Sequence, residues 1–292
     1  MSEATQSPTE EGEPVLYDVR GRVAIVTMHR PAYRNAQNAK MTFALDDAFA
    51  RAVNDDNVGC IVLAGAGDHF SAGHDIGTPG RDIHKPFERR ATSWYPHADK
   101  PGSENIFVRE AELYVGMCRR WRELPKATIA MVQGACIAGG LMLAWSCDLI
   151  IASDDAFFAD PVLRMGIPGV EYFAHPFVMN PRLAKEFLFL GDRMGAGRAA
   201  EVGMINRVVP RAELEAQTLA LADRIAAQPR FAVALAKRAI HTAEDRMGMR
   251  DTMDAVYGLH HLAHAHNSLT SPDHLAGQDA RSMAGANRSQ GR

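Results

Sequence analysis

The spacing of hydrophobic positions predicts short buried strands that alternate with amphipathic helices. Runs of β-branched and apolar residues, typical of strands, occupy 22–28, 58–64, 128–132, 149–152, 156–159 and 205–209. Helical spacing predicts helices over 105–123, 141–145, 171–179, 182–190, 196–202, 213–227, 231–243 and 249–267, and one that Asn38 caps and Asp55 ends. Strands and helices that alternate early, followed by helices alone, indicate an α/β core with a helical C-terminal part.

The stretch 126–148 contains the first candidate site. A strand over 128–132 ends at Gly134, and Gly139 opens a short helix that is apolar on all sides. The first amides of a helix have no partner within the helix, and the helix dipole makes this end positive. Because Gly139 has no Cβ, a ligand oxygen could approach the main chain closely, as an oxyanion site requires. Close packing of a helix on a strand would explain the same glycines.

Three regions fall outside the regular pattern. Residues 77–103 contain prolines, charges and aromatic residues without a period, which predicts a surface excursion or lid. The polar residues 1–14 and residues 269–292, rich in Ala, Gly, Ser and Arg, are predicted to be flexible tails. Between these tails we expect a core over 15–210 and a helical region over 211–268.

Composition narrows the class of protein. The 292 residues are 47% hydrophobic, which suffices for a large core, and the net charge of −3 argues against nucleic-acid binding. No apolar run approaches the roughly 20 residues of a membrane span, so no membrane partner is expected. The four cysteines lie in apolar runs without metal-ligand spacing, which is typical of reduced thiols in a cytoplasmic protein.

An ordered set of motifs identifies a family. The motifs are His29-Arg30-Pro31 with Arg34-Asn35-Ala36, Phe70-Ser71-Ala72-Gly73-His74-Asp75-Ile76, Lys126 with Gln133-Gly134 and Ala138-Gly139-Gly140, Cys147-Asp148, Asp155 to Phe158, Pro161 to Gly166, and Ala200 to Val209. In this order and spacing, the chain resembles the crotonase family, also called enoyl-CoA hydratase/isomerase, over roughly residues 15–243. The resemblance implies a ββα superhelix of stacked sheets with a helical C-terminal region that forms homotrimers, often paired into hexamers.

The resemblance also implies a site for an acyl-CoA thioester in fatty-acid metabolism. In the family, two backbone amides hold the thioester enolate oxygen, and here they belong to His74 and Gly139. The residues that match the coenzyme A-binding loops are Arg34, Asn35, Ala36, Ala72, Asp75 and Ile76. Arg34 is either a partner of a phosphate group or an ordinary exposed arginine. Coenzyme A is then part of the substrate, and we expect no separate cofactor and no metal.

Two positions depart from the family pattern. Family hydratases use one glutamate to activate water and a second to help proton transfer. This chain has Met142 at the first position and Val162 at the second. Neither side chain can transfer a proton, and such groups usually contribute about 10²–10⁴-fold each. The sequence therefore argues against hydration by a glutamate pair, although hydratase is the label that the family suggests.

Other side chains could transfer the proton instead. Glu171 is the first candidate, because it follows the Pro168-Gly169 turn in the loop that borders the acyl pocket of the family. A dienoyl-CoA isomerase branch carries a carboxylate one position earlier, at Val170 here. The further candidates are Asp160, Tyr172, His175 and the side chain of His74. The resemblance thus implies an acyl-CoA-processing enzyme that stabilises a thioester enolate between the two backbone amides. The alternatives are an enoyl- or dienoyl-CoA isomerase that uses Glu171 and an acyl-CoA-binding protein without catalysis.

Four histidines near the C-terminus form a separate cluster. His260, His261, His264 and His266 are spaced so that some imidazoles share one face of a helix. A metal site would require neutral rings, a defined geometry and partners behind the ligands. We expect a solvated or interfacial face instead.

Overall fold

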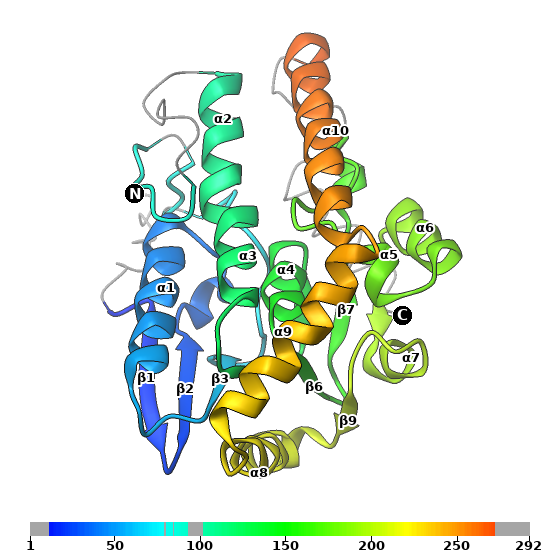
Figure 1. Ribbon diagram of the computed structural model, residues 1–292. Helices are drawn as coiled ribbons and strands as arrows, with labels where there is room; N and C mark the ends of the chain where they lie inside the picture. Colours follow the sequence, from blue (N-terminus) through cyan, green and yellow to red (C-terminus); the bar gives the residue numbers. More distant parts are fainter. Residues whose placement is uncertain (1–11, 79, 84, 93–101, 272–292) are drawn as a thin grey trace, which may run out of the picture.

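Two β-sheets form the framework of the protein (Figure 1). The computed structural model describes residues 12–271 except 79, 84 and 93–101, so most of the predicted tails and part of the predicted lid lie outside the described residues. The larger sheet has the order β1 (Val15–Arg20), β2 (Val23–Met28), β3 (Cys60–Gly65), β4 (Ala127–Val132), β6 (Leu149–Ser153) and β9 (Arg207–Val209). The smaller sheet has the order β5 (Ala135–Ile137), β7 (Phe157–Ala159) and β8 (Met194–Gly195).

Helices connect and cover these sheets. They are α1 (Ala39–Asn54), α2 (Ser103–Glu110), α3 (Met117–Arg122), α4 (Gly139–Ser146), α5 (His175–Val178), α6 (Pro181–Leu190), α7 (Ala196–Glu201), α8 (Leu214–Ala226), α9 (Arg230–Arg246) and α10 (Met249–Thr270). In the larger sheet, β1 is antiparallel to β2 and all other neighbours are parallel. Parallel neighbours require crossover connections, and α1 provides the one between β2 and β3.

The larger sheet separates two hydrophobic cores. Along β2, Ala24, Val26 and Met28 face the main core, while Val23 and Ile25 face a smaller one. Side chains alternate because successive Cβ atoms of a strand point to opposite faces. The main core also contains buried residues of α1, α3 and α4, and α8 closes the smaller core. Strands buried on both faces are apolar almost throughout, which is why the sequence reveals them clearly.

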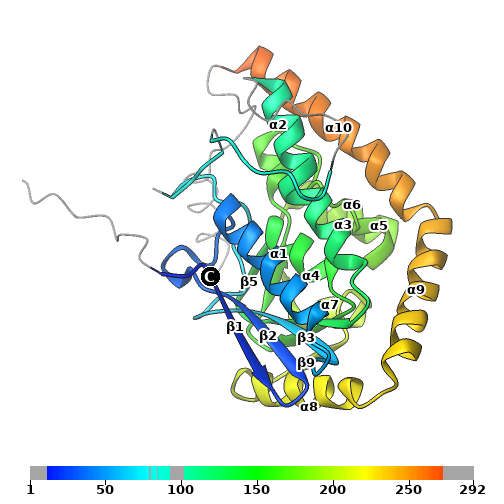
Figure 2. The same cartoon turned by 60° about the vertical axis from the view of Figure 1, so that its left-hand side comes forward.

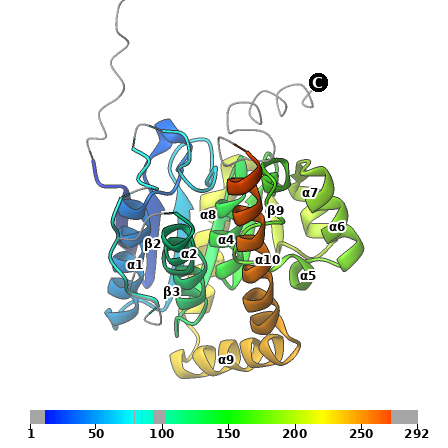
Figure 3. The same ribbon diagram turned by 90° about the horizontal axis from the view of Figure 1, so that it is seen from above.

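The last two helices leave the sheets and return to the middle of the chain. After α8 passes beneath the larger sheet, α9 and α10 curve along one side of the molecule (Figure 2). Seen from above, α10 lies beside α2 (Figure 3). The Tyr257 hydroxyl of α10 donates a hydrogen bond of 2.5 Å to the Phe107 carbonyl of α2. Residues far apart in sequence therefore meet between these two helices.

Most elements fall where the sequence predicts them, with four differences. Strands β1, β5 and β8 have no counterpart in the prediction. The predicted helix over 171–179 is reduced to α5, because 171–174 form an irregular turn. The predicted helix over 105–123 contains a π-helix, Ala111–Gly116, between α2 and α3. Helix α10 continues to Thr270, two residues into the predicted tail. The Asn38 cap is confirmed, since its side chain accepts a hydrogen bond of 2.9 Å from the Met41 amide.

The four cysteines are free thiols, as their sequence context predicts; Cys60, Cys118 and Cys136 are buried and Cys147 is half-buried. Burial raises the pKa of Cys60 and of Cys147 to about 12, so both stay protonated at neutral pH. Among the described residues, no helix combines the length and the hydropathy that a bilayer crossing needs.

Candidate active site

The turns that carry His74 and Gly139 lie against each other. Gly73, with a φ of +94°, comes so close to the start of α4 that a Cβ added to it would lie 3.0 Å from the Gly139 nitrogen. Ala138 has a φ of +48°, which turns the chain sharply from β5 into α4. Within the described part of the chain, neither the His74 nor the Gly139 amide donates a hydrogen bond. The structure thus brings together two unpaired main-chain donors, which an oxyanion site needs.

The imidazole of His74 occupies the space beside Gly139. A Cβ added to Gly139 would lie 2.6 Å from Cδ2 and Nε2 of this ring. The ring also stacks on Tyr114, with centroids 3.5 Å apart and planes within 9° of parallel. We expected a ligand oxygen to use the space left by the missing Cβ of Gly139. That expectation is wrong, because the His74 ring fills this space.

Glu171 points inward from its irregular loop toward the same ring. Its Oε1 lies 3.7 Å from His74 Nδ1, and the residue is 5% exposed. Burial and the negative charge of Glu110 raise the pKa of Glu171 to about 8. Burial lowers the pKa of His74 to about 4, so this ring is neutral at pH 7. A buried carboxyl group therefore lies beside the side chain of the residue that carries one of the two free amides.

The alternative acid–base candidates are held in internal contacts. His175 Nε2 lies 2.9 Å from Asp160 Oδ2, and both side chains are fully buried. The same oxygen accepts a hydrogen bond of 3.1 Å from the Val170 amide. Tyr172 is also fully buried, and burial raises its pKa. Asp160 and His175 therefore close the loop that carries Glu171, which suits a structural role.

The residues predicted to contact coenzyme A divide into two groups. Asn35 is fully buried, and its side chain donates to the carbonyls of Ala66 and His69 at 2.9 and 2.8 Å. Asp75 is also buried and forms an ion pair with Arg30, 3.0 Å between Oδ2 and Nη1. These two side chains hold the loop from inside.

The remaining members of the predicted set lie closer to solvent, with one exception. Arg34 has a φ of +51° and an exposed side chain, and Ile76 is exposed as well. Ala72 is half-buried, and its amide donates to the Arg34 carbonyl at 2.9 Å. Ala36 is buried. Arg34 is therefore the one cation of this set that faces outward.

The two positions that carry glutamates in the family hold apolar residues here, and their surroundings are apolar as well. Met142 lies on α4 and is 1% exposed within the main core. Val162 is half-buried against the same core. Neither position offers a group that could activate water.

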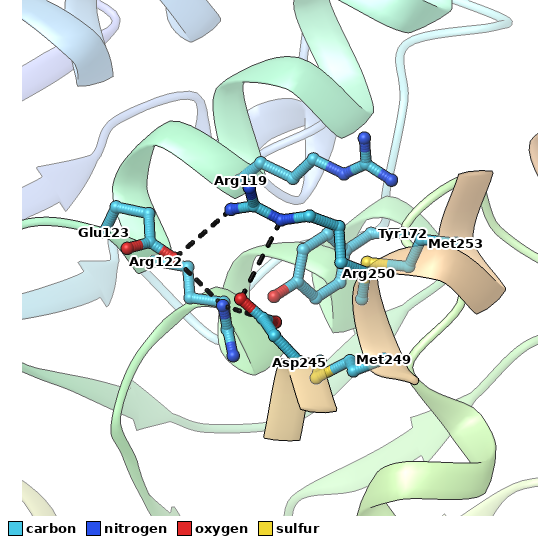
Figure 4. Close-up of a pocket in the computed structure, with 8 residues that line it drawn as sticks. All are labelled: Arg119, Arg122, Glu123, Tyr172, Asp245, Met249, Arg250 and Met253. Carbon is cyan, nitrogen blue, oxygen red and sulfur yellow. Dashed lines mark hydrogen bonds and ion pairs between the residues drawn. The ribbon is translucent and has the colours of Figure 1, made fainter. Parts of the chain in front are cut away.

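A small surface recess lies elsewhere, between α3, α9 and α10 (Figure 4). Its walls are Arg119, Arg122, Glu123, Tyr172, Asp245, Met249, Arg250 and Met253. Arg122 and Arg250 form ion pairs with the acidic residues in it, Arg122 Nη1 at 3.2 Å from Asp245 Oδ1. None of the predicted site residues except Tyr172 lines this recess.

Two residues near the site have no counterpart in the sequence prediction. Glu110 ends α2, and Tyr114 lies in the π-helix that follows. Both side chains are buried and lie close to the His74–Glu171 pair, Tyr114 by stacking and Glu110 through its charge. The one available signal was a set of charges, Arg109, Glu110 and Glu112, within an otherwise apolar helical stretch.

The fold and the paired amides define a protein of the crotonase class, and the comparisons agree. The sequence pattern of the enoyl-CoA hydratase/isomerase family matches residues 18–97 and 110–272. The structure of a probable enoyl-CoA hydratase from Mycobacterium smegmatis superposes with a TM-score of 0.81 and 42% identity, covering 91% of this chain and 99% of that one. The chain therefore belongs to the enoyl-CoA hydratase/isomerase family. The predicted ββα superhelix with a helical C-terminal region is confirmed.

Two curated relatives show the range of names within this similarity. A putative enoyl-CoA hydratase, EchA13, of Mycobacterium tuberculosis is 42% identical over 255 residues, 84% of this chain and 78% of its own. A 4-chlorobenzoyl coenzyme A dehalogenase of an Arthrobacter species is 31% identical over 224 residues, 75% of this chain and 74% of its own. The names cover different reactions of coenzyme A thioesters.

Proposed function

We propose that this chain is an enzyme that acts on an acyl-CoA thioester by moving a proton at the carbon next to the carbonyl. The thioester oxygen accepts hydrogen bonds from the amides of His74 and Gly139, and Glu171 takes and returns the proton. The observation that carries this proposal is the buried Glu171 carboxyl group, 3.7 Å from the side chain of the residue that bears one of the two free amides.

The two parts of this site act on the same intermediate. Removing a proton beside a thioester places negative charge on the carbonyl oxygen. Preorganised main-chain donors at about 2.7–3.1 Å stabilise that charge, and each donor typically contributes on the order of 10²–10³ in rate. A single carboxylate can remove the proton from one carbon and return it to another. Migration of a double bond in an enoyl- or dienoyl-CoA is thus the reaction that this site supports best.

Hydration by a glutamate pair finds less support. Water addition needs a base that activates water, and Met142 and Val162 stand where the family places its two glutamates. The different names of the relatives agree with a site in which the amides are retained while other side chains change. The missing pair also favours a second candidate, an acyl-CoA-binding protein without turnover.

Coenzyme A would extend from the amides toward the Arg34 loop. The side chain of Arg34 is exposed, and Arg suits bidentate phosphate binding. Asn35 and Asp75 would shape this loop from inside and would not contact the ligand through their side chains.

Exchange of the α-protons of a saturated acyl-CoA in D₂O tests the proposal without knowledge of the natural substrate. We expect the wild-type protein to exchange these protons for deuterium, measured by mass spectrometry over acyl chains of several lengths. Glu171→Gln should slow exchange by about 10²–10⁴-fold, because the amide cannot accept the proton. Glu186→Gln, which alters an exposed glutamate of α6, is the matched control.

Two results would decide against parts of the proposal. Exchange that is equally fast in Glu171→Gln would remove this residue from the mechanism. Tight acyl-CoA binding by calorimetry, with no exchange and no turnover of enoyl- or dienoyl-CoA, would favour the binding protein.

A further inference from the structure

Three donor atoms converge in the space between α2 and α10. The His260 Nε2 lies 3.2 Å from Glu110 Oε2, and the His264 Nε2 lies 3.3 Å from Glu110 Oε1. The two imidazole Nε2 atoms are 3.1 Å apart. Of the solvated or interfacial face expected for these histidines, the solvated alternative is wrong for His260, whose side chain is 4% exposed; the Glu110 carboxylate is 11% exposed.

These separations match the edges of a metal coordination shell. Nitrogen and oxygen ligands about 2.1 Å from a tetrahedral metal ion are about 3.4 Å apart. The three observed separations, 3.1, 3.2 and 3.3 Å, are all near this value. The two imidazoles approach different oxygens of the Glu110 carboxylate, and one ligand atom from each of the three residues lies within 4.8 Å of the other two, close enough to share one ion.

The orientation of His260 is fixed from behind. Its Nδ1 lies 3.0 Å from the Gly169 carbonyl oxygen, which can only accept a hydrogen bond. The Nδ1 therefore carries a proton, and in the neutral ring the lone pair of Nε2 points at Glu110 and His264. Metal-bound histidines usually have such a carbonyl or carboxylate partner on the second ring nitrogen.

Some polar atoms of this cluster have no hydrogen-bond partner within the described part of the protein. Among the described residues, Glu110 Oε2 and His261 Nε2 have no well-directed hydrogen bond, although they lie 3.2 Å apart. An oxygen of a buried carboxylate that lacks a directed donor is unfavourable to folding. A cation bound between the three donor atoms would remove this deficit.

We propose that Glu110, His260 and His264 bind one divalent transition-metal ion of the zinc class. Two imidazoles and one carboxylate are a ligand set that suits Zn²⁺ and its neighbours in the first transition row. His261 lies behind the ligands as a partner of Glu110. Glu171, with Oε1 3.8 Å from His260 Nε2, lies between the metal site and His74. Metal binding at this site can be tested separately from the reaction proposed above.

Metal analysis of untagged full-length protein tests the site. The metal is first removed with a chelator, and the protein is then reloaded with Zn²⁺. We expect inductively coupled plasma mass spectrometry to detect one equivalent of zinc per chain. Co²⁺ in place of zinc should produce the visible absorption of a four- or five-coordinate site. Changing a residue that only supports a metal ligand weakens metal binding by up to about 100-fold. Loss of a ligand itself should weaken Zn²⁺ binding by more than this.

Three variants separate this site from general binding by histidines. Glu110→Gln and His264→Gln should lose the zinc and the cobalt spectrum, with circular dichroism confirming that each is folded. His266→Gln changes an exposed histidine of the same helix and should keep both. If a variant does not fold, the wild-type stoichiometry and cobalt spectrum decide. Folded wild-type protein without stoichiometric zinc, or zinc retained equally in both ligand variants, would overturn the proposal.

Discussion

Crowding and backbone strain concentrate in the few residues around the two free amides. Ala138 adopts a left-handed φ of +48°, which costs a non-glycine residue about 1–3 kcal/mol. Beside it, Gly139 leaves room for the His74 ring, which in turn stacks on Tyr114. Such strain persists only where the surrounding packing determines the conformation, and here it aims the Gly139 amide.

Gly139→Ala should disturb this arrangement. Its Cβ would lie 2.6 Å from the His74 ring, so the ring or the start of α4 must move. We expect a loss of about 1–3 kcal/mol in the free energy of unfolding and a drop of about 10²–10³ in α-proton exchange. Thermal denaturation and the exchange assay measure the two effects.

Two further variants test whether overlap with the His74 ring causes the loss of stability in Gly139→Ala. His74→Ala in the same chain should restore most of the lost stability, because it removes the overlapping ring. Gly197→Ala, with no atom within 4 Å of the added Cβ, should change stability by less than about 1 kcal/mol. Full exchange activity in Gly139→Ala would contradict the assignment of this amide.

At the scale of elements, the π-helix Ala111–Gly116 shapes one wall of the site. A π-helix inserts an extra residue into an α-helix and is frequent at functional sites. Here it lies between Glu110 and α3 and carries Tyr114 onto His74. It also carries Glu112, whose buried carboxylate accepts hydrogen bonds of 2.6 and 2.7 Å from the amides of Ala91 and Thr92. This element thus connects Ala91 and Thr92 to the site.

The loop that carries Glu171 depends on a second internal contact. Asp160 accepts hydrogen bonds from both Val170 and His175, so it joins the beginning of the loop to its end. The side chains of Asp160 and His175 are fully buried, and removal of one partner leaves the other without compensation.

Asp160→Ala should therefore destabilise the protein by about 3 kcal/mol, since it leaves a buried amide and a buried imidazole without their acceptor. Urea denaturation with an unchanged m-value would measure this loss. Asp192→Ala is the control, because Asp192 forms an exposed ion pair with Arg164 that is worth less than about 1 kcal/mol. A loss below 1 kcal/mol in Asp160→Ala would show that this contact does not hold the loop.

At the scale of the whole molecule, the last two helices leave apolar side chains uncovered. The large exposed residues on and between α9 and α10 are Phe231, Leu235, Ile240, Met247, Leu259, Leu262 and Leu269, each at least half exposed. Side chains of this kind in such number are typical of a surface that contacts another chain. They agree with the homotrimer or hexamer that the sequence predicts.

Light scattering after size-exclusion chromatography should therefore detect particles of three or six chains. Phe231→Glu combined with Leu262→Glu should shift the protein toward monomers, because two buried charges without partners oppose association. Leu16→Glu alters an exposed leucine on β1, away from α9 and α10, and should leave the assembly unchanged (Figure 1). A monomeric wild-type protein would contradict the prediction.

The sequence by itself determined those features that depend on neighbouring residues. Periodicity located the strands of the larger sheet except the edge strand β1, because strands buried on both faces must be apolar along their length, whereas β1 is largely exposed. The Asn38 cap was predictable because it involves residues three positions apart. The ordered motifs identified the family, and the resemblance points to the two amides, because glycine permits the tight main-chain turns at these positions.

Only the tertiary structure decided which side chains meet. The direction of Glu171 follows from packing in an irregular loop, for which no period exists. Strand β5, three residues long, forms through pairing with β7, and the π-helix has no periodic signature of its own. Glu110 and His260 are distant in sequence and meet because α10 packs beside α2. Such contacts depend on how whole elements are arranged, which local residue patterns do not encode.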